Sequence, residues 1–303
     1  MGIKKDLMTL ISLIVILAGV CIMFIYACNE VRPVETEEIP VEEGIVLHEQ
    51  MSSFDRYMEN KGRRPVEVIA HRGFSSVAPD NTVGSFTKAI TAGCDQIKLD
   101  VQMTKDGAIV VFHDMDLSYI TGEKGKIGDY YFSEVSNINV GSYYGYDDFQ
   151  EENIPRLQDA LDLVKNRDVK INLELKNIGK NETFVRRVVG LVTINHLEDK
   201  VIFSSFRYDY LEIIKSIDPD LKTEYVSDSG DYEELVTKYP ADYYNLRFTN
   251  VTKSTVDMLH YYSKKVFVWT VNDVESMKMA LDMDVDGVVT NCPDLLEMVV
   301  ASY

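Results

Sequence analysis

Residues 66–71 read VEVIAH and residues 95–100 read DQIKLD, and these two runs begin the pattern that decides the fold. Six further short runs rich in β-branched residues follow at fairly even intervals, with amphipathic stretches between them. They are KINLEL (170–175), VIFSSF (201–206), KTEYVS (222–227), DYYNLR (242–247), KVFVWT (265–270) and DGVVTN (286–291). Strands that alternate with helices predict a parallel sheet, and eight such units that close on themselves predict a (β/α)8 TIM barrel.

The stretches between these runs carry apolar residues at helical spacing. Val83, Phe86 and Ala89 recur in this way within residues 82–92, and a second helix is expected over residues 274–282. A single barrel of this kind needs roughly 250 residues. The 303 residues therefore accommodate one α/β barrel, expected over residues 64–303, and an N-terminal appendage.

One additional run, AIVVFH (108–113), does not belong to the eight. Only the TKDG segment separates it from the extended second run, whereas a parallel crossover needs a dozen or more residues. These two runs therefore predict a β-hairpin, followed by an insertion over about residues 115–150. A long polar and aromatic excursion at this point is typical of a lid or a binding element.

The N-terminal appendage contains an uncharged apolar run, LMTLISLIVILAGVCIMFIYAC, over residues 7–28. As a helix it is long enough to cross a hydrocarbon core of about 30 Å. Lys4 and Lys5 precede it and six glutamates follow it, so the tip is expected in the cytoplasm and the barrel outside the cell membrane. We expect residues 1–28 to form the tip and transmembrane helix, and residues 29–63 an acidic linker. A cleaved signal peptide, or a lipoprotein cysteine at Cys28, is the alternative.

Charge and cysteine content limit the partners. A formal net charge of −18 argues against nucleic acid, which is held by clustered Lys and Arg, and against adhesion to anionic lipid through a basic patch. A phosphate ligand would have to be held by a local positive site. Cys94 and Cys292 have no zinc-ligand spacing, and both buried thiols and a disulfide between them stay open.

Ionisable residues follow the first strands of the predicted barrel, where the catalytic face of this fold lies. His71 and His113 suit general acid–base chemistry near neutral pH. The cations of this group, which offer positive charge to a phosphodiester, are Arg72, Lys98 and Lys176. The carboxylates Asp100 and Glu174 are donors of the kind that hold Mg²⁺ or Ca²⁺. The set as a whole indicates phosphoryl chemistry.

Trp269, the only tryptophan, ends the seventh run. It is expected either in the core or as a wall of the catalytic pocket.

Several segments resemble the glycerophosphodiester phosphodiesterase family in order and spacing over residues 66–296. They are AHRGFSSVAPDNTVGSF, LDVQMTKDGAIVVFHD, INLELK, SSF at 204–206, VFVWTVN and DGVVTNCPD. The resemblance implies cleavage of a glycerophosphodiester into glycerol 3-phosphate and an alcohol, often with the neighbouring glycerol hydroxyl attacking phosphorus.

The resemblance also implies a role for each residue of the site. It makes His71 and His113 the acid–base or nucleophilic pair, Arg72 and Lys176 phosphate ligands, and Trp269 a wall on the alcohol side. It makes Asp100 and Glu174 metal ligands, with a weaker contribution from Asp80.

Two residues depart from the family pattern. Asp80 stands where the resemblance implies Glu, and Lys98 stands where it implies a metal-binding Glu. An ammonium at this place adds a fixed cation and removes part of the metal cage. The first hypothesis is therefore an active extracytoplasmic phosphodiesterase in which Lys98 partly or wholly replaces a divalent cation. The second is a catalytically impaired barrel that serves as a binding or scaffolding protein.

Overall fold

The computed structural model describes residues 66–303, except residues 119–121, 123, 146, 177, 180, 230 and 231. Its strands are β1 (Glu67–His71), β2 (Gln96–Met103), β3 (Ile109–Val111), β4 (Lys170–Leu175), β5 (Val201–Ser205), β6 (Lys222–Ser227), β7 (Tyr243–Arg247), β8 (Lys265–Trp269) and β9 (Gly287–Thr290). All except β3 are parallel to their neighbours, in the order β1-β9-β8-β7-β6-β5-β4-β2, and pairing of β1 with β2 closes the ring. The predicted eight-stranded TIM barrel is confirmed.

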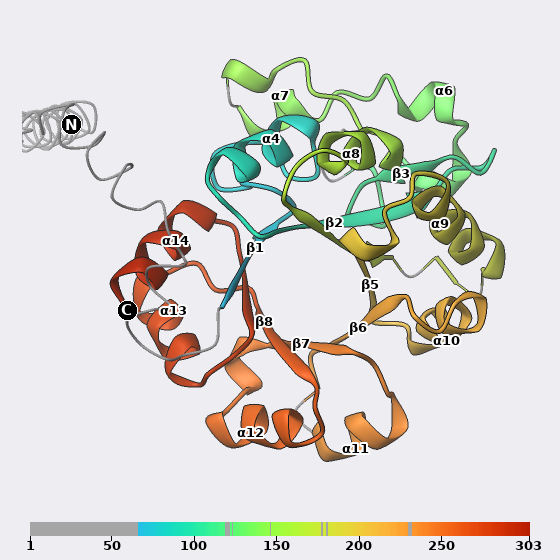
Figure 1. Ribbon diagram of the computed structural model, residues 1–303. Coiled ribbons are helices and arrows are strands. Elements are labelled where there is room, and N and C mark those ends of the chain that lie inside the picture. Colours follow the sequence, from blue (N-terminus) through green and yellow to red (C-terminus); the bar gives the residue numbers. More distant parts are fainter. Residues whose placement is uncertain are drawn as a thin grey trace, which may run out of the picture. The chain divides into compact units, whose positions relative to one another are not determined.

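Helices surround the ring of strands (Figure 1). They are α4 (Val83–Thr91), α6 (Phe132–Val135), α7 (Gly141–Tyr144), α8 (Leu157–Val164), α9 (Glu182–Ile194), α10 (Tyr208–Ile217), α11 (Tyr232–Lys238), α12 (Lys253–Tyr261), α13 (Val274–Asp282) and α14 (Pro293–Ser302). Short 3₁₀ turns lie at Ile127–Asp129, Asp147–Phe149, Glu198–Lys200 and Phe248–Asn250. The helices expected over residues 82–92 and 274–282 are α4 and α13.

Alternation along each strand divides the side chains between two layers. In β1, Val68 and Ala70 pack in the large core between sheet and helices, whereas Ile69 belongs to a small apolar cluster with Ile202 and Phe267 inside the barrel. The same parity directs His71 into the barrel at the carboxyl end of β1. The strands thus determine which side chains reach the site.

The β2–β3 hairpin is confirmed. Val101 pairs with Val111 and Met103 with Ile109 in antiparallel register. The insertion that follows has an apolar cluster of its own, made of Val110, Phe112, Leu117, Ile127, Val135, Val140 and Ile154. It carries α6 and α7 beside α4 and α8 (Figure 1). The insertion is thus a packed element, and its role as a lid or a binding element stays a prediction.

The expected transmembrane helix and acidic linker lie outside the described residues. Within residues 66–303, as far as they are described, no helix is both long enough and apolar enough to span a bilayer. Cys94, which is buried, and Cys292, which is half-buried, are both free thiols.

Candidate active site

The turn after β1 directs Arg72 over the rim of the barrel. Arg72 and Gly73 have positive φ values of 59° and 83°. A Cβ atom on Gly73 would lie 2.6 Å from the backbone carbonyl carbon of Ser85 in α4, so the turn requires glycine. The backbone N–H of Arg72 donates to the carbonyl of Lys98 at 2.7 Å, and its Nη1 lies 2.7 Å from Asp80 Oδ2. Arg72 is thereby held next to β2.

His71 has a neutral amide as its partner. Its Nδ1 lies 2.7 Å from Oδ1 of Asn291, which follows β9. With Nδ1 as the donor to this amide oxygen, Nε2 is the unprotonated nitrogen. Burial and, next, the Arg72 guanidinium lower the pKa of His71 to about 4. His71 is therefore neutral at physiological pH and able to accept a proton.

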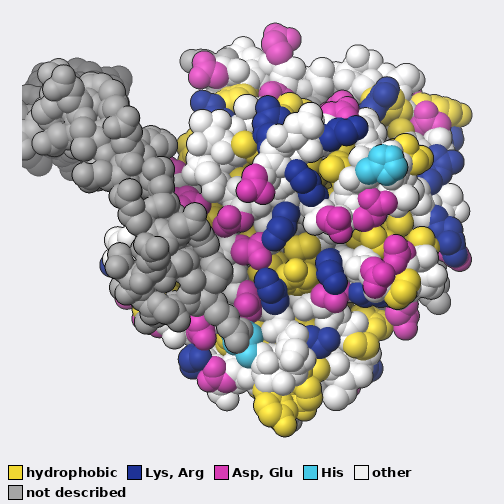
Figure 2. Space-filling model, viewed as in Figure 1, with side chains coloured by type: hydrophobic (Ala, Val, Ile, Leu, Met, Phe, Trp, Pro, Cys, Tyr) yellow, Lys and Arg dark blue, Asp and Glu magenta, His cyan; other side chains and the backbone are white. Residues whose placement is uncertain are grey.

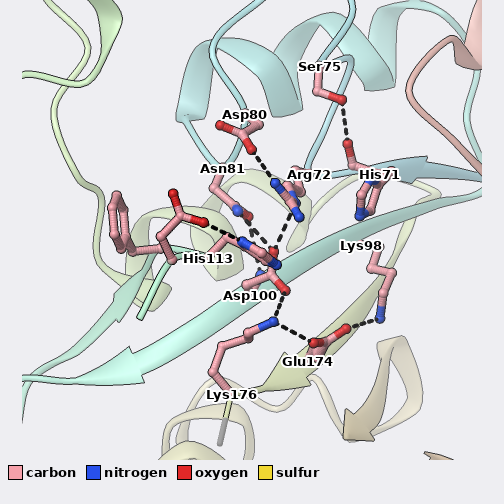
Figure 3. A network of polar contacts seen from close by, with 12 residues as sticks. His71, Arg72, Ser75, Asp80, Asn81, Lys98, Asp100, His113, Glu174 and Lys176 are labelled. Atoms are coloured by element: carbon pink, nitrogen blue, oxygen red, sulfur yellow. Dashed lines mark hydrogen bonds and ion pairs between the residues drawn. The ribbon is translucent and has the colours of Figure 1, made fainter. Parts of the chain in front are cut away.

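His113, at the end of the hairpin, has a carboxylate as its partner. Its Nδ1 lies 2.8 Å from Asp114 Oδ1, and this hydrogen bond holds the pKa of Asp114 below its usual range. Figure 3 shows the imidazoles of His71 and His113 on either side of the Arg72–Asp100 contact. The two histidines thus have different partners within one site.

Asp100 lies beneath Arg72 and is almost fully buried. Its Oδ2 accepts a hydrogen bond from Asn81 Nδ2 at 2.9 Å and lies 3.5 Å from Arg72 Nε. Its Oδ1 lies 3.6 Å from Lys176 Nζ. Burial opposes ionisation, but Lys176 and Arg72 hold the pKa of Asp100 well below its usual range. Asp100 therefore stays ionised and orients the two cations.

Lys98 lies deeper in the barrel, and the residue is 4% exposed. Its Nζ lies 2.9 Å from Glu174 Oε2 and 3.7 Å from Glu224 Oε1. It also donates to Asn172 Oδ1 at 3.1 Å and to Ser204 Oγ at 3.2 Å. Burial lowers the pKa of Lys98, but Glu174 and Glu224 outweigh it and raise the pKa above its usual value. Lys98 is a permanent cation whose direct contact with a phosphate stays a prediction.

Glu224 is a residue of this site that the sequence reasoning missed. It points into the barrel from β6, accepts hydrogen bonds from Asn172 Nδ2 at 2.6 Å and Asn245 Nδ2 at 2.9 Å, and has no exposed surface. Burial raises the pKa of its carboxyl, and Lys98 opposes this. The alternation of side chains along the run KTEYVS was the available signal. Thr223 and Tyr225 take the outer positions of this strand, so Glu224 between them must point into the barrel. Asn81, which precedes α4, and Asn291, which follows β9, were also missed, and strand parity gives no signal for residues outside the strands.

The carboxylates expected to bind a divalent cation are already engaged. Glu174 Oε1 lies 2.9 Å from Lys176 Nζ, and its Oε2 faces Lys98 (Figure 3). Both oxygens of Asp100 face cations or an amide donor, and Asp80 is paired with Arg72. In the described part of the chain, no three His, Cys, Asp or Glu residues form a group suited to a metal ion. Because the ammonium groups of Lys98 and Lys176 contact both oxygens of Glu174, these residues do not fit a divalent cation.

Trp269 lies inside the rim at the end of β8. It packs against the apolar cluster within the barrel, and its Nε1 donates to the carbonyl of Asn245 at 3.1 Å. Phe206, which follows β5, meets it edge to face with ring centroids 5.8 Å apart. Trp269 is thus half-buried, and its role as a wall of the catalytic pocket stays a prediction.

Positive charge is local in this acidic protein. On the face shown in Figure 2, basic and acidic side chains are interspersed without a large patch of either sign. Arg72, Lys98 and Lys176, by contrast, lie together at the catalytic end of the barrel. A TIM barrel whose strand ends carry two histidines and three cations defines a class, the barrel-fold phosphoric diester hydrolases.

The chain belongs to the glycerophosphodiester phosphodiesterase family, because residues 71–295 match the Glycerophosphoryl diester phosphodiesterase family. It is 32% identical over 232 residues to a glycerophosphodiester phosphodiesterase of Caldanaerobacter subterraneus subsp. tengcongensis, covering 76% of this chain and 95% of that one. It is 34% identical over 234 residues to that of Bacillus altitudinis, with coverages of 75% and 95%.

Solved structures agree with this assignment. An Oleispira antarctica phosphodiesterase in complex with the product sn-glycerol-3-phosphate superposes with a TM-score of 0.73 at 27% identity, over 77% of this chain and 96% of that one. The Silicibacter pomeroyi structure, a putative glycerophosphoryl diester phosphodiesterase, also gives 0.73, at 26% identity and with coverages of 81% and 97%. The family and fold are thereby established.

Proposed function

We propose that this protein hydrolyses glycerophosphodiesters to glycerol 3-phosphate and an alcohol, with His71 and His113 as the proton-transfer pair and side-chain cations in place of a divalent ion. The family match supports the reaction, and the product complex of the Oleispira relative supports glycerol 3-phosphate as the product. The observation that carries the proposal is the difference between the two histidines: one is bonded to an amide, the other to a carboxylate.

This difference assigns a direction to proton transfer. His71, neutral and with Nε2 unprotonated, accepts the proton of the hydroxyl that attacks phosphorus. His113, oriented by its hydrogen bond with Asp114, donates a proton to the oxygen of the leaving alcohol. Attack by the neighbouring glycerol hydroxyl releases the protonated alcohol and leaves a cyclic phosphodiester. Water then opens this ring: His113 accepts a proton from the water, and His71 returns its proton to the glycerol oxygen that leaves phosphorus, which gives glycerol 3-phosphate.

The cations form two tiers in this proposal. Arg72 and Lys176 lie at the rim, partly exposed, and neutralise the phosphate oxygens as charge develops. Lys98 lies below them and compensates Glu174 and Glu224, so that these carboxylates do not repel the substrate. Such fixed cations perform the electrostatic part of the task that a metal ion performs elsewhere.

Release of glycerol 3-phosphate from glycerophosphoglycerol and glycerophosphocholine, measured with an enzyme-coupled assay, tests this function. His71→Ala and His113→Ala should each lower kcat/KM by at least about 10²-fold with an unchanged circular dichroism spectrum. His196→Asn, a change at an exposed histidine after α9, is the matched control and should retain activity. Near wild-type turnover in either variant would refute the role of that histidine. No turnover of any diester by the folded wild type would favour the scaffolding alternative.

A further inference from the structure

The mouth of the barrel has two chemically different halves. The ends of β1, β2 and β4, together with the hairpin, carry the histidines, Asp100 and the rim cations described above. The ends of β5, β7 and β8 carry Phe206, Arg247 and Trp269. The first half holds the reacting phosphate in the proposed function. The second half is where the leaving alcohol would lie.

Two features of β7 place Arg247 in the second half of the mouth: its pairing with β8 and the alternation of its side chains. It pairs with Trp269 across the β7–β8 ladder. Tyr244 and Leu246 pack in the outer core, so Asn245 and Arg247 take the inward positions of β7. Arg247 therefore lies on the same side of the sheet as Trp269.

The guanidinium of Arg247 lies over the indole of Trp269, with its Cζ 4.8 Å from the ring centroid. This is the position that a cationic headgroup would take in an aromatic site. The Arg247 side chain is 46% exposed, and its nearest anion is Asp228, with Nη2 and Oδ2 3.7 Å apart. Because Asp228 is itself 64% exposed, this contact is weak and leaves the guanidinium able to bind a second anion.

We infer that this half of the mouth is a subsite for an alcohol that carries a further phosphate group, with Arg247 as the residue that selects it. The inference rests on the proposed function and specifies its substrate class. A phosphate on the alcohol would meet the Arg247 fork, which matches two phosphate oxygens, while the carbon skeleton would contact Trp269 and Phe206. A choline group, in contrast, would find the indole face covered by a like charge.

The chemistry of the reaction is unchanged by this choice. Hydrolysis adds one water across the bond between phosphorus and the alcohol oxygen. The products are glycerol 3-phosphate and the phosphorylated alcohol, which keeps its own phosphate. A glycerol phosphate polymer and a glycerophosphoinositol phosphate both present this group, and the two differ in the skeleton between the phosphates.

Four diesters with a common glycerophosphoryl part and different alcohols test the inference on the full-length protein. They are a glycerol phosphate dimer with a terminal phosphate, glycerophosphoinositol 4-phosphate, neutral glycerophosphoglycerol and glycerophosphocholine. We expect both phosphorylated alcohols to give higher kcat/KM than the neutral one, and choline to give the lowest. A preference between the first two identifies the source of the phosphate.

Variants of Arg247 then test the residue itself. Arg247→Ala should reduce the ratio of kcat/KM for the terminally phosphorylated dimer over glycerophosphocholine by about fivefold, through KM. It should also improve KM for glycerophosphocholine, because the indole face becomes free. Arg247→Glu should reverse the preference. Arg186→Ala, which removes an exposed arginine of α9 paired with Glu182, is the matched control and should leave the ratio unchanged.

The outcomes separate this inference from the proposed function. If the wild type hydrolyses the diesters but Arg247→Glu leaves the substrate ratio unchanged, Arg247 does not select the alcohol and the inference is wrong. If glycerophosphocholine is the preferred substrate of the wild type, the inference is wrong as well. If the folded protein hydrolyses none of the four diesters, it is the proposed function that fails.

Discussion

At the scale of the residue, the partner of each imidazole decides its role. His71 is bonded to an uncharged amide and lies near Arg72, whereas His113 is bonded to the Asp114 carboxylate. The two roles therefore belong to the environments that the β1 turn and the hairpin create, and not to the imidazoles.

The lowered pKa of His71 predicts a pH dependence of stability. The folded-state pKa of about 4 lies below the unfolded value of 6.5, so between these values the unfolded chain binds a proton that the folded chain does not. The contribution is fully present above pH 6.5 and is lost as the pH falls towards 4. By pH 5 the loss should be about 2 kcal/mol of unfolding free energy.

Urea unfolding at pH 7.5 and pH 5 measures this effect. The wild type should lose more stability over this interval than His71→Gln, which cannot titrate, and the difference should approach the value above. An equal loss in both proteins would show that His71 keeps an ordinary pKa in the folded state.

At the scale of the element, the sequence predicted the barrel because each strand is signalled locally. β-Branched runs gave all eight barrel strands and the hairpin, and the segment from Val274 to Asp282 was predicted with its exact bounds as α13. The ends of these strands placed the predicted catalytic residues and cations together. Strand parity is a local property, so it can be taken from a single sequence.

Other features depend on contacts between distant residues and had a weak local signal or none. In the insertion, the spacing of the apolar residues Leu117, Ile127 and Val135 matches neither a helix nor a strand. These residues pack together only in the folded protein. Glu224 differs from the insertion, because strand parity was a local signal for its inward position. That signal is weak for a lone charged residue, which usually faces solvent, and its partners Asn172 and Asn245 come from other strands. The network around Lys98 therefore had to be seen in three dimensions.

At the scale of the whole molecule, we propose that the barrel is anchored outside the cell membrane by the apolar segment of residues 7–28. The proposal rests on the length of this run and on the lysines that precede it. An enzyme in this place would meet diesters of the cell surface rather than those of the cytoplasm.

Fractionation of cells that express the full-length chain tests the anchor. The protein should remain in the membrane fraction after an alkaline wash, and a protease added to intact spheroplasts should digest the barrel but not a tag on residue 1. Release of the mature chain into the medium would show that the segment is a cleaved signal.

In the proposed mechanism, Lys98 and its neighbouring cations take the place of a divalent ion. In the described structure Lys98 Nζ lies 2.9 Å from Glu174, and Lys176 Nζ lies at the same distance from the other oxygen of that carboxylate. Lys98→Glu would replace this cation with a carboxylate beside Asp100, Glu174 and Glu224. Mutual repulsion should then make the variant bind Mg²⁺ or Ca²⁺, visible as a rise in Tm on addition of the ion.

The most direct measurement is kcat/KM for glycerophosphoglycerol before and after exhaustive chelation, in the wild type and in Lys98→Glu. We expect the wild type to keep its activity in chelator, whereas Lys98→Glu should depend on added Mg²⁺ or Ca²⁺ for turnover and gain Tm when the ion is added. A wild type that chelator silences and that Mg²⁺ or Ca²⁺ fully restores would contradict it.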